Sequence, residues 1–384
     1  MNAVILTYSR FPNGDAGAVR QELLAKLLIL QGYKTIVVGM GESTHYKSRY
    51  YNGVEYLSFR GNKSSFFSRI SNYFGYASRL RKWLSARERV DVMLVIDLPL
   101  NAMRYAEKYA KREQAILIHD SVEWYSAEEF KLHWIDPNYL LNHYKNSFFY
   151  QKPWKIIGIS SYLERHFHRM GLDTIRIPAM MDTASIRPGK RCDPQKTVIM
   201  YAGSPGRKDC FSQIVSAIGV LSEEERTRLE FRVIGITQAQ MHDEVEFSNS
   251  NWEIVKNCVN CIGKVQRQEV LKNLEEADFT VLIRMSELRY AKAGFPTKVP
   301  ESLATGTPVI CNLSSDLGMY LKDGENAIIL KSRDVNDVAI GLRRAIHMSE
   351  AEKRKMQIAA RKTAERCFDY KLYAEELVGL IQAK

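Results

Sequence analysis

The chain alternates short, continuous apolar runs with longer segments whose apolar residues recur at helical spacing. A first series of apolar runs comprises residues 3–7, 35–39, 92–96, 115–119 and 156–159. A second series comprises residues 197–202, 230–234, 279–283, 308–311 and 327–330. Strands that are apolar throughout belong to sheets covered on both faces, and strands that alternate with helices form parallel, doubly wound domains. We therefore predict an α/β protein with two Rossmann-like domains.

The break between the two series predicts the domain boundary. Residues 182–196 are polar and rich in helix and strand breakers, and the strand pattern restarts at Thr197. We predict an N-terminal domain at 1–188, a second domain at 189–366, and a helix at 367–384 that packs back on the first domain. Because open parallel sheets bind ligands at the carboxyl ends of their strands, two facing sheets predict a deep cleft between the domains.

Composition and charge narrow the class of protein. The net charge is +11, and residues 1–190 hold 27 Lys and Arg against 17 Asp and Glu, so the first domain is expected to face something anionic. No apolar run approaches the roughly 20 residues of a membrane span, and the N-terminus lacks a basic leader. These features predict a cytoplasmic protein. Cys258 and Cys261, the only close cysteine pair, are predicted to be core residues rather than half of a zinc site.

The first strand is followed by a loop, residues 8–18, that contains Gly14 and Gly17. These glycines allow the backbone to approach a ligand, and the helix that follows offers free N–H groups to an anion. A purely structural turn is an equal alternative.

The corresponding loop of the second domain carries two cations. Gly203 and Ser204 precede Arg207 and Lys208 between a predicted strand and a predicted helix. Arg offers a bidentate fork to phosphate oxygens and Lys a mobile point charge. Its place at the carboxyl end of a strand favours diphosphate binding over a solvated basic turn.

The segment 279–301 carries the richest combination of charge and turn residues. Gly294 and Pro296 indicate a tight turn before a helix, and Glu301 lies one turn into that helix, where a carboxylate can accept hydrogen bonds from two ribose hydroxyls. The cations of the segment are Arg284, Arg289, Lys292 and Lys298. The alternative is a charged surface loop.

At these residues the sequence resembles family 4 of the retaining glycosyltransferases, whose fold is called GT-B. The segment from Gly294 to Ile310, GFPTKVPESLATGTPVI, is similar to the donor-site segment of that family, and DGENAIIL at 323–330 is similar to its following turn. Upstream, Ile157–Ser160 and Ile177–Asp182 resemble its interdomain pieces. The resemblance covers the second domain well and the first more loosely.

The resemblance implies a nucleotide-sugar donor that is held mainly by the second domain. Glu301 would hold the nucleotide ribose, Lys208 the donor diphosphate, and His119 would reach the sugar from the first domain. The first domain would bind the acceptor, with Gly14 and Gly17 on the acceptor side. Gly203 and Ser204 would approach the phosphates, and the sugar-phosphate turn would be lined by Gly294, Phe295, Pro296 and Thr297.

Two positions depart from the family pattern. Ala293 stands where the first glutamate of the Glu-x7-Glu motif is expected, and Ser204 stands where an arginine is usual. Arg207 would supply that charge instead, and Lys298 is a candidate phosphate contact. These departures concern the sugar contacts more than the fold.

Retaining transfer needs no dedicated base if the leaving diphosphate takes the proton of the acceptor. Cations stabilise the charge that develops on that diphosphate, and we expect Arg207, Lys208 and Lys298 to do so. The sequence holds no Asp-x-Asp pair, so we expect neither a metal nor another cofactor. His119 keeps a structural alternative as a satisfied residue at a strand end.

The basic, aromatic segment 60–89 holds eight Lys and Arg. Its helical stripe Phe67, Ile70, Phe74, Ala77 and Leu84 is expected to face the core. The further aromatics suggest contact with an anionic membrane leaflet at the inner face of the membrane, against an ordinary solvated helix.

The expected function is transfer of a sugar to a polysaccharide, a lipid-linked or a protein acceptor. A nucleotide-sugar epimerase of the same architecture and a non-catalytic glycosyltransferase-like subunit are the alternatives, and Ala293 is the best support for the subunit. No nucleic-acid module is recognisable, so nucleic acid is not an expected partner.

Overall fold

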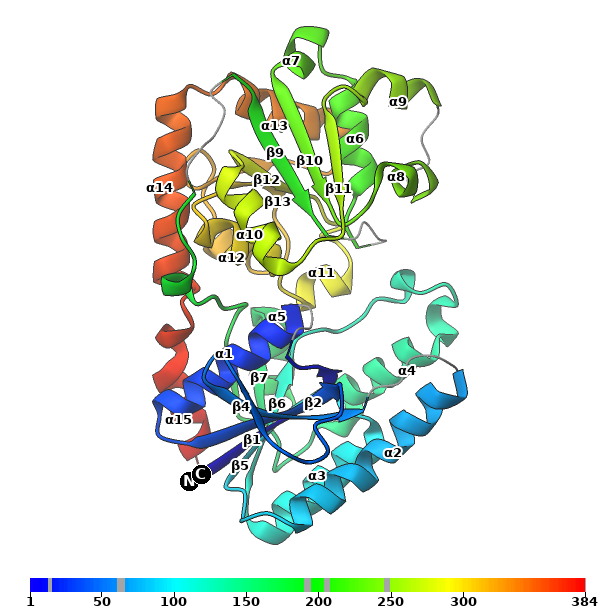
Figure 1. Cartoon of the computed structure of the whole chain (residues 1–384), viewed down its shortest axis with the longest axis vertical. Helices are drawn as coiled ribbons and strands as arrows, with labels where there is room; N and C mark the ends of the chain where they lie inside the picture. Colours follow the sequence, from blue (N-terminus) through cyan, green and yellow to red (C-terminus); the bar gives the residue numbers. More distant parts are fainter. Residues whose placement is uncertain (13–15, 61–65, 190–194, 204–207, 245–248, 384) are drawn as a thin grey trace. The chain divides into compact units, whose positions relative to one another are not determined.

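The computed structural model describes residues 1–12, 16–60, 66–189, 195–203, 208–244 and 249–383, with the side chains of 66–69 and 242–251 outside the description. The chain folds into two compact units. Unit 1 comprises residues 1–123, 144–180 and 370–384, and unit 2 comprises residues 124–143 and 181–369 (Figure 1). The division therefore differs from the predicted boundaries in one main respect: residues 124–143 belong to unit 2, although the chain around them belongs to unit 1.

Unit 1 contains a sheet of eight strands among the described residues, in the order β3-β4-β2-β1-β5-β6-β7-β8. All neighbours pair in parallel except β3 and β4. The strands are β1 Asn2–Arg10, β2 Lys34–Gly41, β3 Arg49–Tyr51, β4 Val54–Arg60, β5 Val92–Ile96, β6 Ile116–Ser121, β7 Lys155–Gly158 and β8 Thr174–Arg176. The five strands predicted for the first domain are present, and the structure adds β3, β4 and β8.

Helices cover both faces of this sheet. On one face α1 and the C-terminal helix α15 share a core with the strands, in which Leu24, Leu377 and Ile381 pack against Ile5 and Leu94. On the other face lie α2 and α3, and the hydroxyl of Tyr76 in α2 donates to the Thr7 carbonyl of β1. The helices of unit 1 are α1 Ala16–Leu30, α2 Phe66–Ser85, α3 Leu100–Glu113, α5 Ser161–Arg169 and α15 Ala374–Gln382.

Unit 2 contains a parallel sheet whose six described strands follow the order β11-β10-β9-β12-β13-β14. The strands are β9 Thr197–Ala202, β10 Leu229–Ile234, β11 Val259–Gly263, β12 Phe279–Leu282, β13 Val309–Asn312 and β14 Ala327–Leu330. Five of them correspond to the predicted runs, and the sixth, β11, contains Cys261, which was predicted to be a core residue. The strand order reverses between β9 and β12, and ligands of doubly wound sheets bind outside the carboxyl ends at such a reversal.

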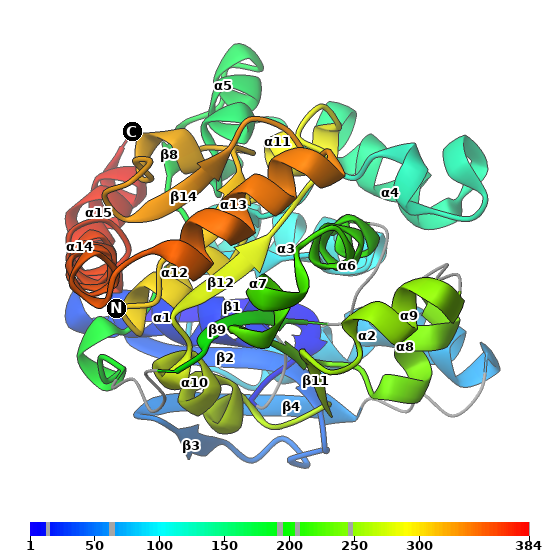
Figure 2. The same cartoon turned by 90° about the horizontal axis from the view of Figure 1, so that it is seen from above.

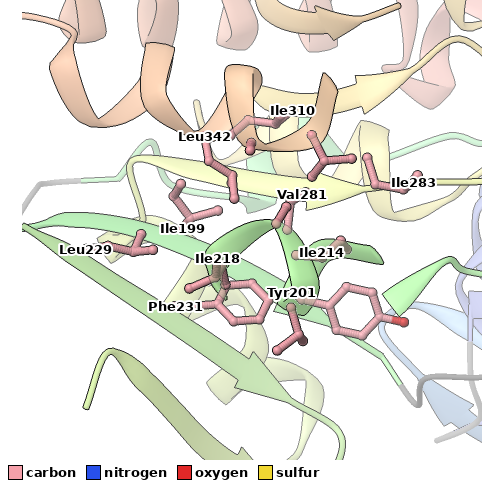
Figure 3. Close-up of a cluster of buried hydrophobic side chains, with 14 of the residues drawn as sticks. Ile199, Tyr201, Ile214, Ile218, Leu229, Phe231, Val281, Ile283, Ile310 and Leu342 are labelled. Carbon is pink, nitrogen blue, oxygen red and sulfur yellow. The ribbon is translucent and has the colours of Figure 1, made fainter. Parts of the chain in front are cut away.

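The helices of unit 2 also lie on both faces of their sheet. On one face α6 and α13 lie side by side over a large apolar core (Figures 1 and 2), in which Ile214, Ile218 and Leu342 pack on strand residues (Figure 3). Alternate strand residues such as Val198 and Met200 face α10 on the other side. The helices are α4 Pro137–Tyr144, α6 Phe211–Gly219, α7 Glu223–Thr227, α8 Gln238–Glu244, α9 Asn249–Val255, α10 Arg267–Glu276, α11 Arg289–Ala293, α12 Lys298–Ala304, α13 Val335–His347 and α14 Glu350–Cys367.

The predicted core-facing stripe of the basic segment is wrong in part. Among the described side chains of α2, Tyr76, Leu80, Trp83 and Leu84 are buried, whereas Ile70 and Phe74 are 40% and 63% exposed. The sequence contains two overlapping apolar sets at helical spacing, and only contact with the sheet selects between them. Phe67 lies outside the described side chains.

Cys258 and Cys261 are core residues, as predicted. Cys258 is buried, its thiol donates to the Val255 carbonyl, and burial raises its pKa to about 11. Burial also raises the pKa of Cys261, which packs against the apolar core of unit 2. Within the described residues no group of three or more His, Cys, Asp or Glu could hold a metal ion. Likewise, no described helix is long and apolar enough to cross a membrane.

Candidate functional site

The loops that leave β9 and β12 meet at the strand-order reversal of unit 2, where the sequence placed the donor site. β9 ends at Ala202, and Gly203 follows with a φ of +145°, a conformation that side chains rarely adopt. A Cβ atom on Gly203 would lie 2.6 Å from the Nζ atom of Lys298. The backbone conformation therefore favours glycine here, and the missing side chain also leaves room for the end of a lysine from the start of α12.

Lys298 is held by an acid that the sequence did not single out. Its Nζ atom donates to Oδ2 of Asp209 at 2.5 Å and lies 3.3 Å from the hydroxyl of Tyr201. That hydroxyl donates to the same carboxylate at 2.8 Å. Tyr201 ends the apolar core of the unit, and Figure 3 shows its hydroxyl pointing away from the labelled apolar side chains. A buried tyrosine thus anchors the ion pair to the sheet.

The same carboxylate also faces Arg284, whose Nε atom lies 3.4 Å from Oδ1 of Asp209. Burial alone would raise the pKa of Asp209, but Lys298 and Arg284 outweigh it and hold the pKa below its usual value. Burial lowers the pKa of Lys298, and the charge of Asp209 opposes that shift. Asp209 is therefore ionised at neutral pH, and two cations share it.

Lys208 is likewise paired with a carboxylate of unit 2. Its Nζ atom lies 3.0 Å from Oε1 of Glu129, and it stands over the rings of Tyr125 and Tyr290 at 5.2 and 5.9 Å. The hydroxyl of Tyr290 donates to the backbone carbonyl of Lys208 at 2.6 Å. The lysine expected on the donor diphosphate therefore lies in a cage of one carboxylate and two rings.

Glu301 lies in the first turn of α12 and is bonded to Arg267, the first residue of α10. Nε of Arg267 donates to Oε1 of Glu301 at 3.2 Å, and Nη2 lies 3.1 Å from the same oxygen. About a fifth of the Glu301 side chain is exposed. Each carboxylate oxygen can accept more than one hydrogen bond, so this ion pair leaves capacity for ribose hydroxyls.

The predicted turn at 294–297 is present, and much of it is buried. Gly294 ends α11 and donates its N–H to Tyr290, while Phe295 packs edge-on against Tyr320, with ring centroids 5.8 Å apart. Pro296 is buried and Thr297 is half-buried. Phe295 therefore contributes its backbone to the turn and its ring to the core.

Ala293 lies beside this turn and is fully buried. A carboxylate at this position would lose its water unless it found a partner, which costs free energy. The missing glutamate of the family motif is thus replaced by a residue that fits a dry environment.

Three of the four cations counted in 284–298 form ion pairs or hydrogen bonds within unit 2. Arg284 and Lys298 face Asp209, and Arg289 donates to the Tyr125 carbonyl and stacks on Trp124, its guanidinium 4.8 Å from the ring centroid. Lys292 is exposed.

The contacts of Arg289 bind residues 124–143 to unit 2. Sequence reasoning missed this segment because its apolar and aromatic residues carry no motif.

In unit 1, His119 occupies β6 and is buried. Its ring stacks on Tyr150 with centroids 4.1 Å apart, and Nδ1 lies 3.1 Å from the Val95 carbonyl oxygen. A carbonyl can only accept, so Nδ1 carries the proton. Burial lowers the pKa of His119 to about 4. The imidazole is therefore neutral at physiological pH, with Nε2 as its free acceptor position.

A buried ion pair that the sequence did not indicate lies next to His119. Arg20 of α1 donates from Nε and Nη2 to the two carboxylate oxygens of Asp120, each at 2.7 Å. It also donates to the carbonyls of Ile177 and Pro178. The pair ties α1 to the carboxyl ends of β6 and β8. Gly17 lies in the first turn of α1.

Three predicted site residues, Gly14, Ser204 and Arg207, lie outside the described residues. The structure brings together Gly203, Lys208 and Lys298 with the turn at 294–297 and Glu301 in unit 2. His119 and Gly17 belong to unit 1.

Residues 182–363 match the model of the family "Glycosyl transferases group 1". No curated protein matches the sequence. The matched residues span almost all of unit 2, including every residue that we place in the donor site apart from the segment at 124–143.

Solved structures match the whole chain at low identity. Sucrose-phosphate synthase from Thermosynechococcus elongatus has a TM-score of 0.76 at 12% identity, over 99% of this chain and 98% of that chain. HepE from Anabaena in complex with UDP has a TM-score of 0.67 at 12% identity, over 99% of each chain. A glycosyltransferase from Rickettsia africae has a TM-score of 0.65 at 14% identity, over 99% and 98%. These likenesses establish the fold as GT-B.

Proposed function

We propose that the chain is a nucleotide-sugar-dependent glycosyltransferase of the group 1 type, and that it transfers the sugar with retention and without a metal ion. The acceptor is a saccharide, a lipid-linked or a protein acceptor. The observation that carries the proposal is the pair of lysines, Lys208 and Lys298, at the strand-order reversal of unit 2.

The two lysines support a diphosphate site. Lys208 lies in the loop that leaves β9, Lys298 reaches that loop from α12, and both are fixed by carboxylates and aromatic rings. Preorganised cations stabilise developing charge more than mobile ones, because they need no reorganisation during reaction. As the bond from the sugar to the diphosphate breaks, negative charge collects on the leaving diphosphate, and these lysines would face it. We propose the same role for Arg207.

Retention follows if the acceptor attacks from the side on which the diphosphate leaves. The departing phosphate oxygen then takes the proton of the acceptor hydroxyl, so no protein base is needed. In this proposal His119 stays neutral and meets the sugar as a hydrogen-bonding group, because burial holds its pKa near 4.

Glu301 would hold the nucleotide through its ribose, since its first-turn position leaves carboxylate capacity beside the Arg267 pair. A fold neighbour, HepE from Anabaena, is described in complexes with UDP and with UDP-glucose. UDP-sugars are therefore the first donors to test, before those of GDP, dTDP and ADP.

We propose that the enzyme works in the cytoplasm, at the inner face of a membrane, through α2. Phe74 and Ile70 of this helix are exposed, and Arg81 and Lys82 follow them on the exposed surface. Exposed apolar side chains beside cations suit an anionic leaflet. A lipid-linked acceptor would be reached there.

Donor hydrolysis without acceptor tests the function. The wild-type protein is incubated with UDP-, GDP-, dTDP- and ADP-sugars, and nucleoside diphosphate release is measured with and without EDTA. We expect release from one donor class, unchanged by EDTA, and lowered at least tenfold in Lys208→Ala and Lys298→Ala, as expected when a charged transition-state contact is lost. Lys272→Ala, which removes an exposed cation of α10, is the control. No release and no thermal stabilisation by any donor would contradict the proposal, and loss of release with EDTA would contradict its metal-free part.

A further inference from the structure

A short segment, residues 125–129, contacts α11 of unit 2, which belongs to the predicted donor-site segment. The hydroxyl of Ser126 accepts the backbone N–H of Tyr290 at 3.0 Å, and the carbonyl of Tyr125 accepts from Arg289. Glu129 follows at the end of a single 3₁₀ turn, Ala127–Glu129. The segment is thus fixed against α11, directly beside Lys208.

Glu129 has two separate tasks within this turn. Its Oε2 atom accepts the backbone N–H of Ser126 at 2.7 Å and closes a capping box, while Oε1 lies 3.0 Å from the Nζ atom of Lys208. The side chain of Glu129 is 6% exposed, and that of Lys208 is 37% exposed. The carboxylate is therefore fixed and nearly dry, whereas the lysine reaches the surface.

This arrangement places a second anion where the donor diphosphate is expected. One ammonium group can donate to a carboxylate or to phosphate oxygens, and a fixed carboxylate beside it repels an incoming diphosphate. The near-complete burial of Glu129 makes this repulsion stronger than for an exposed pair, because water screens it less.

We propose that Glu129 is a positioning residue that holds Lys208 in the empty donor site and competes with the diphosphate for it. The inference rests on the proposed diphosphate role of Lys208 and extends it to a second residue. Glu129 weakens the binding of the donor and of the product nucleoside diphosphate alike, and thereby favours product release.

The variant Glu129→Gln separates the two tasks of the side chain. An amide oxygen can still accept the N–H of Ser126, so the capping box is preserved, but the negative charge beside Lys208 is gone. We expect UDP to bind about threefold to tenfold more tightly by calorimetry, since a partly buried charge pair has a moderate coupling energy. Uridine, which has no phosphate, should bind unchanged.

A double-mutant cycle assigns the effect to Lys208. In a Lys208→Ala background, Glu129→Gln should change UDP affinity much less than in the wild type, because the competition needs the lysine. Steady-state kinetics provides a second readout: KM for the donor and the inhibition constant of UDP should both fall in Glu129→Gln, and kcat should not rise.

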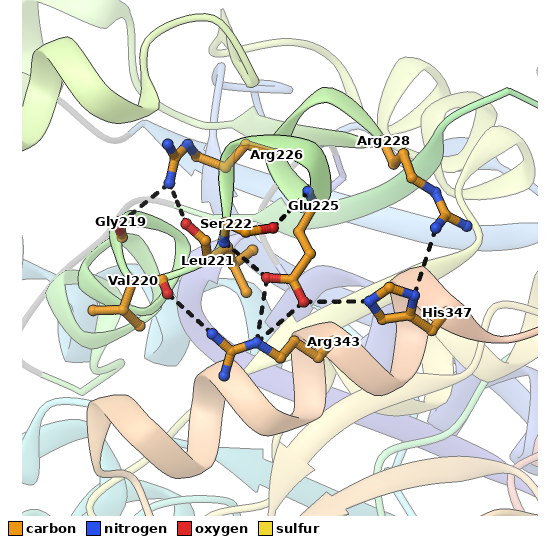
Figure 4. Close-up of polar contacts among 9 residues, drawn as sticks. All are labelled: Gly219, Val220, Leu221, Ser222, Glu225, Arg226, Arg228, Arg343 and His347. Carbon is orange, nitrogen blue, oxygen red and sulfur yellow. Dashed lines mark hydrogen bonds and ion pairs between the residues drawn. The ribbon is translucent and has the colours of Figure 1, made fainter.

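Glu225 offers a matched control in the same unit. Its carboxylate closes a capping box with Ser222 and pairs with Arg343 and His347 (Figure 4). It lies on α7, which leads into the amino end of β10. The donor site lies at the carboxyl ends of the strands, on the opposite side of the sheet. Glu225→Gln therefore removes a similar capping carboxylate and should alter stability without changing UDP affinity.

The outcomes distinguish the two levels of the argument. If the wild type binds none of UDP, GDP, dTDP and ADP, the proposed function fails and this inference with it. If it binds and Lys208→Ala binds equally well, the diphosphate role of Lys208 fails. If Lys208→Ala weakens binding but Glu129→Gln leaves it unchanged or weaker, only the competition by Glu129 is overturned. Should Glu129→Gln not fold, Glu129→Asp, which withdraws the carboxylate by one methylene, must show tighter binding in the same direction.

Discussion

Lys298 places its Nζ atom 2.5 Å from Oδ2 of Asp209, a residue 89 positions away in the chain. This candidate phosphate contact is therefore already paired with a carboxylate of the protein itself, which it shares with Arg284. Lys208, the residue before Asp209 in the chain, forms a similar ion pair with Glu129. The site combines fixed cations with fixed counter-charges, so it is less positive than its lysines and arginines alone suggest.

The first prediction concerns the Asp209 pair. Asp209→Asn leaves Lys298 and Arg284 without their shared carboxylate, and we expect the free energy of unfolding in urea to fall by about 1–3 kcal/mol. Lys298 and Arg284 lower the pKa of Asp209, so its contribution is complete above the usual carboxyl range and is lost as pH falls through the lowered value. The difference between wild type and variant should therefore shrink in acid.

Glu253→Gln is the control for this measurement, because Glu253 pairs with Lys256 on the exposed surface of the same unit. Its effect should stay within about 0.5 kcal/mol. An Asp209→Asn variant as stable as the wild type would show that the pair contributes no net stability.

The second prediction concerns His119. Its pKa is lowered from 6.5 to about 4 by burial, so the unfolded chain takes up a proton before the folded chain does as pH falls. The contribution of His119 to the free energy of unfolding is fully present above pH 6.5. As the pH falls toward 4, this contribution should decrease by up to about 3 kcal/mol. His119→Phe, which preserves a ring against Tyr150, should remove that part of the slope.

Urea unfolding at a series of pH values checks the His119 prediction. His168→Gln, which replaces an exposed histidine of the same unit, serves as the control. A slope that is identical in His119→Phe and wild type would mean that His119 is not held neutral.

The third prediction concerns Glu301. If its carboxylate holds the ribose, Glu301→Ala should weaken UDP binding roughly tenfold or more, the loss expected for charge-assisted hydrogen bonds. The 2′-deoxy form of UDP should bind more weakly to wild type but lose less on Glu301→Ala, because one of the two contacts is already missing. Calorimetry measures both.

Arg267→Ala is the control variant for Glu301→Ala, since it removes the ion pair of Glu301 but leaves the carboxylate in place. Its affinity for UDP should change far less than that of Glu301→Ala. Equal affinity of Glu301→Ala and wild type would remove Glu301 from the site.

The fourth prediction concerns α2. Phe74→Ser should weaken binding to vesicles that contain anionic lipid, and binding of the wild type should decrease with salt, because cations supply part of the attraction. Leu372→Ser, which replaces an exposed apolar residue elsewhere in the same unit, should bind as wild type. Vesicle binding that is absent or insensitive to salt in the wild type would favour a solvated helix.

The fold was largely predictable, because its signal is local. Each predicted strand is a run of apolar residues with a turn or helix on either side, and that pattern depends only on neighbours in the chain. The missed strands β3, β4 and β8 contain polar residues or are short. In α2 the periodicity was correct, but two apolar sets compete, and Tyr76 and Trp83 are buried whereas Phe74 is exposed.

The candidate site was predictable only for the residues that lie in recognisable motifs. Lys208, Lys298 and Glu301 lie in motifs whose spacing is visible along the chain. Asp209, Glu129 and Arg267 lie in no motif, and each becomes a partner only because folding brings distant segments together. The sequence does not show which acid pairs with a given lysine or arginine. The number of cations in 284–298 therefore overestimated the unpaired positive charge of that segment.

The sequence by itself thus determined the two α/β units, the loops that carry the donor-site lysines and the match of residues 182–363 to the glycosyl transferases group 1 model, since these follow from local periodicity and contiguous motifs. Only the tertiary structure decided that residues 124–143 join unit 2, that Gly203 makes room for Lys298, and that Asp209 and Glu129 neutralise the two lysines. The physical reason is that Coulombic and steric contacts depend on distance in space, which the order of residues does not give.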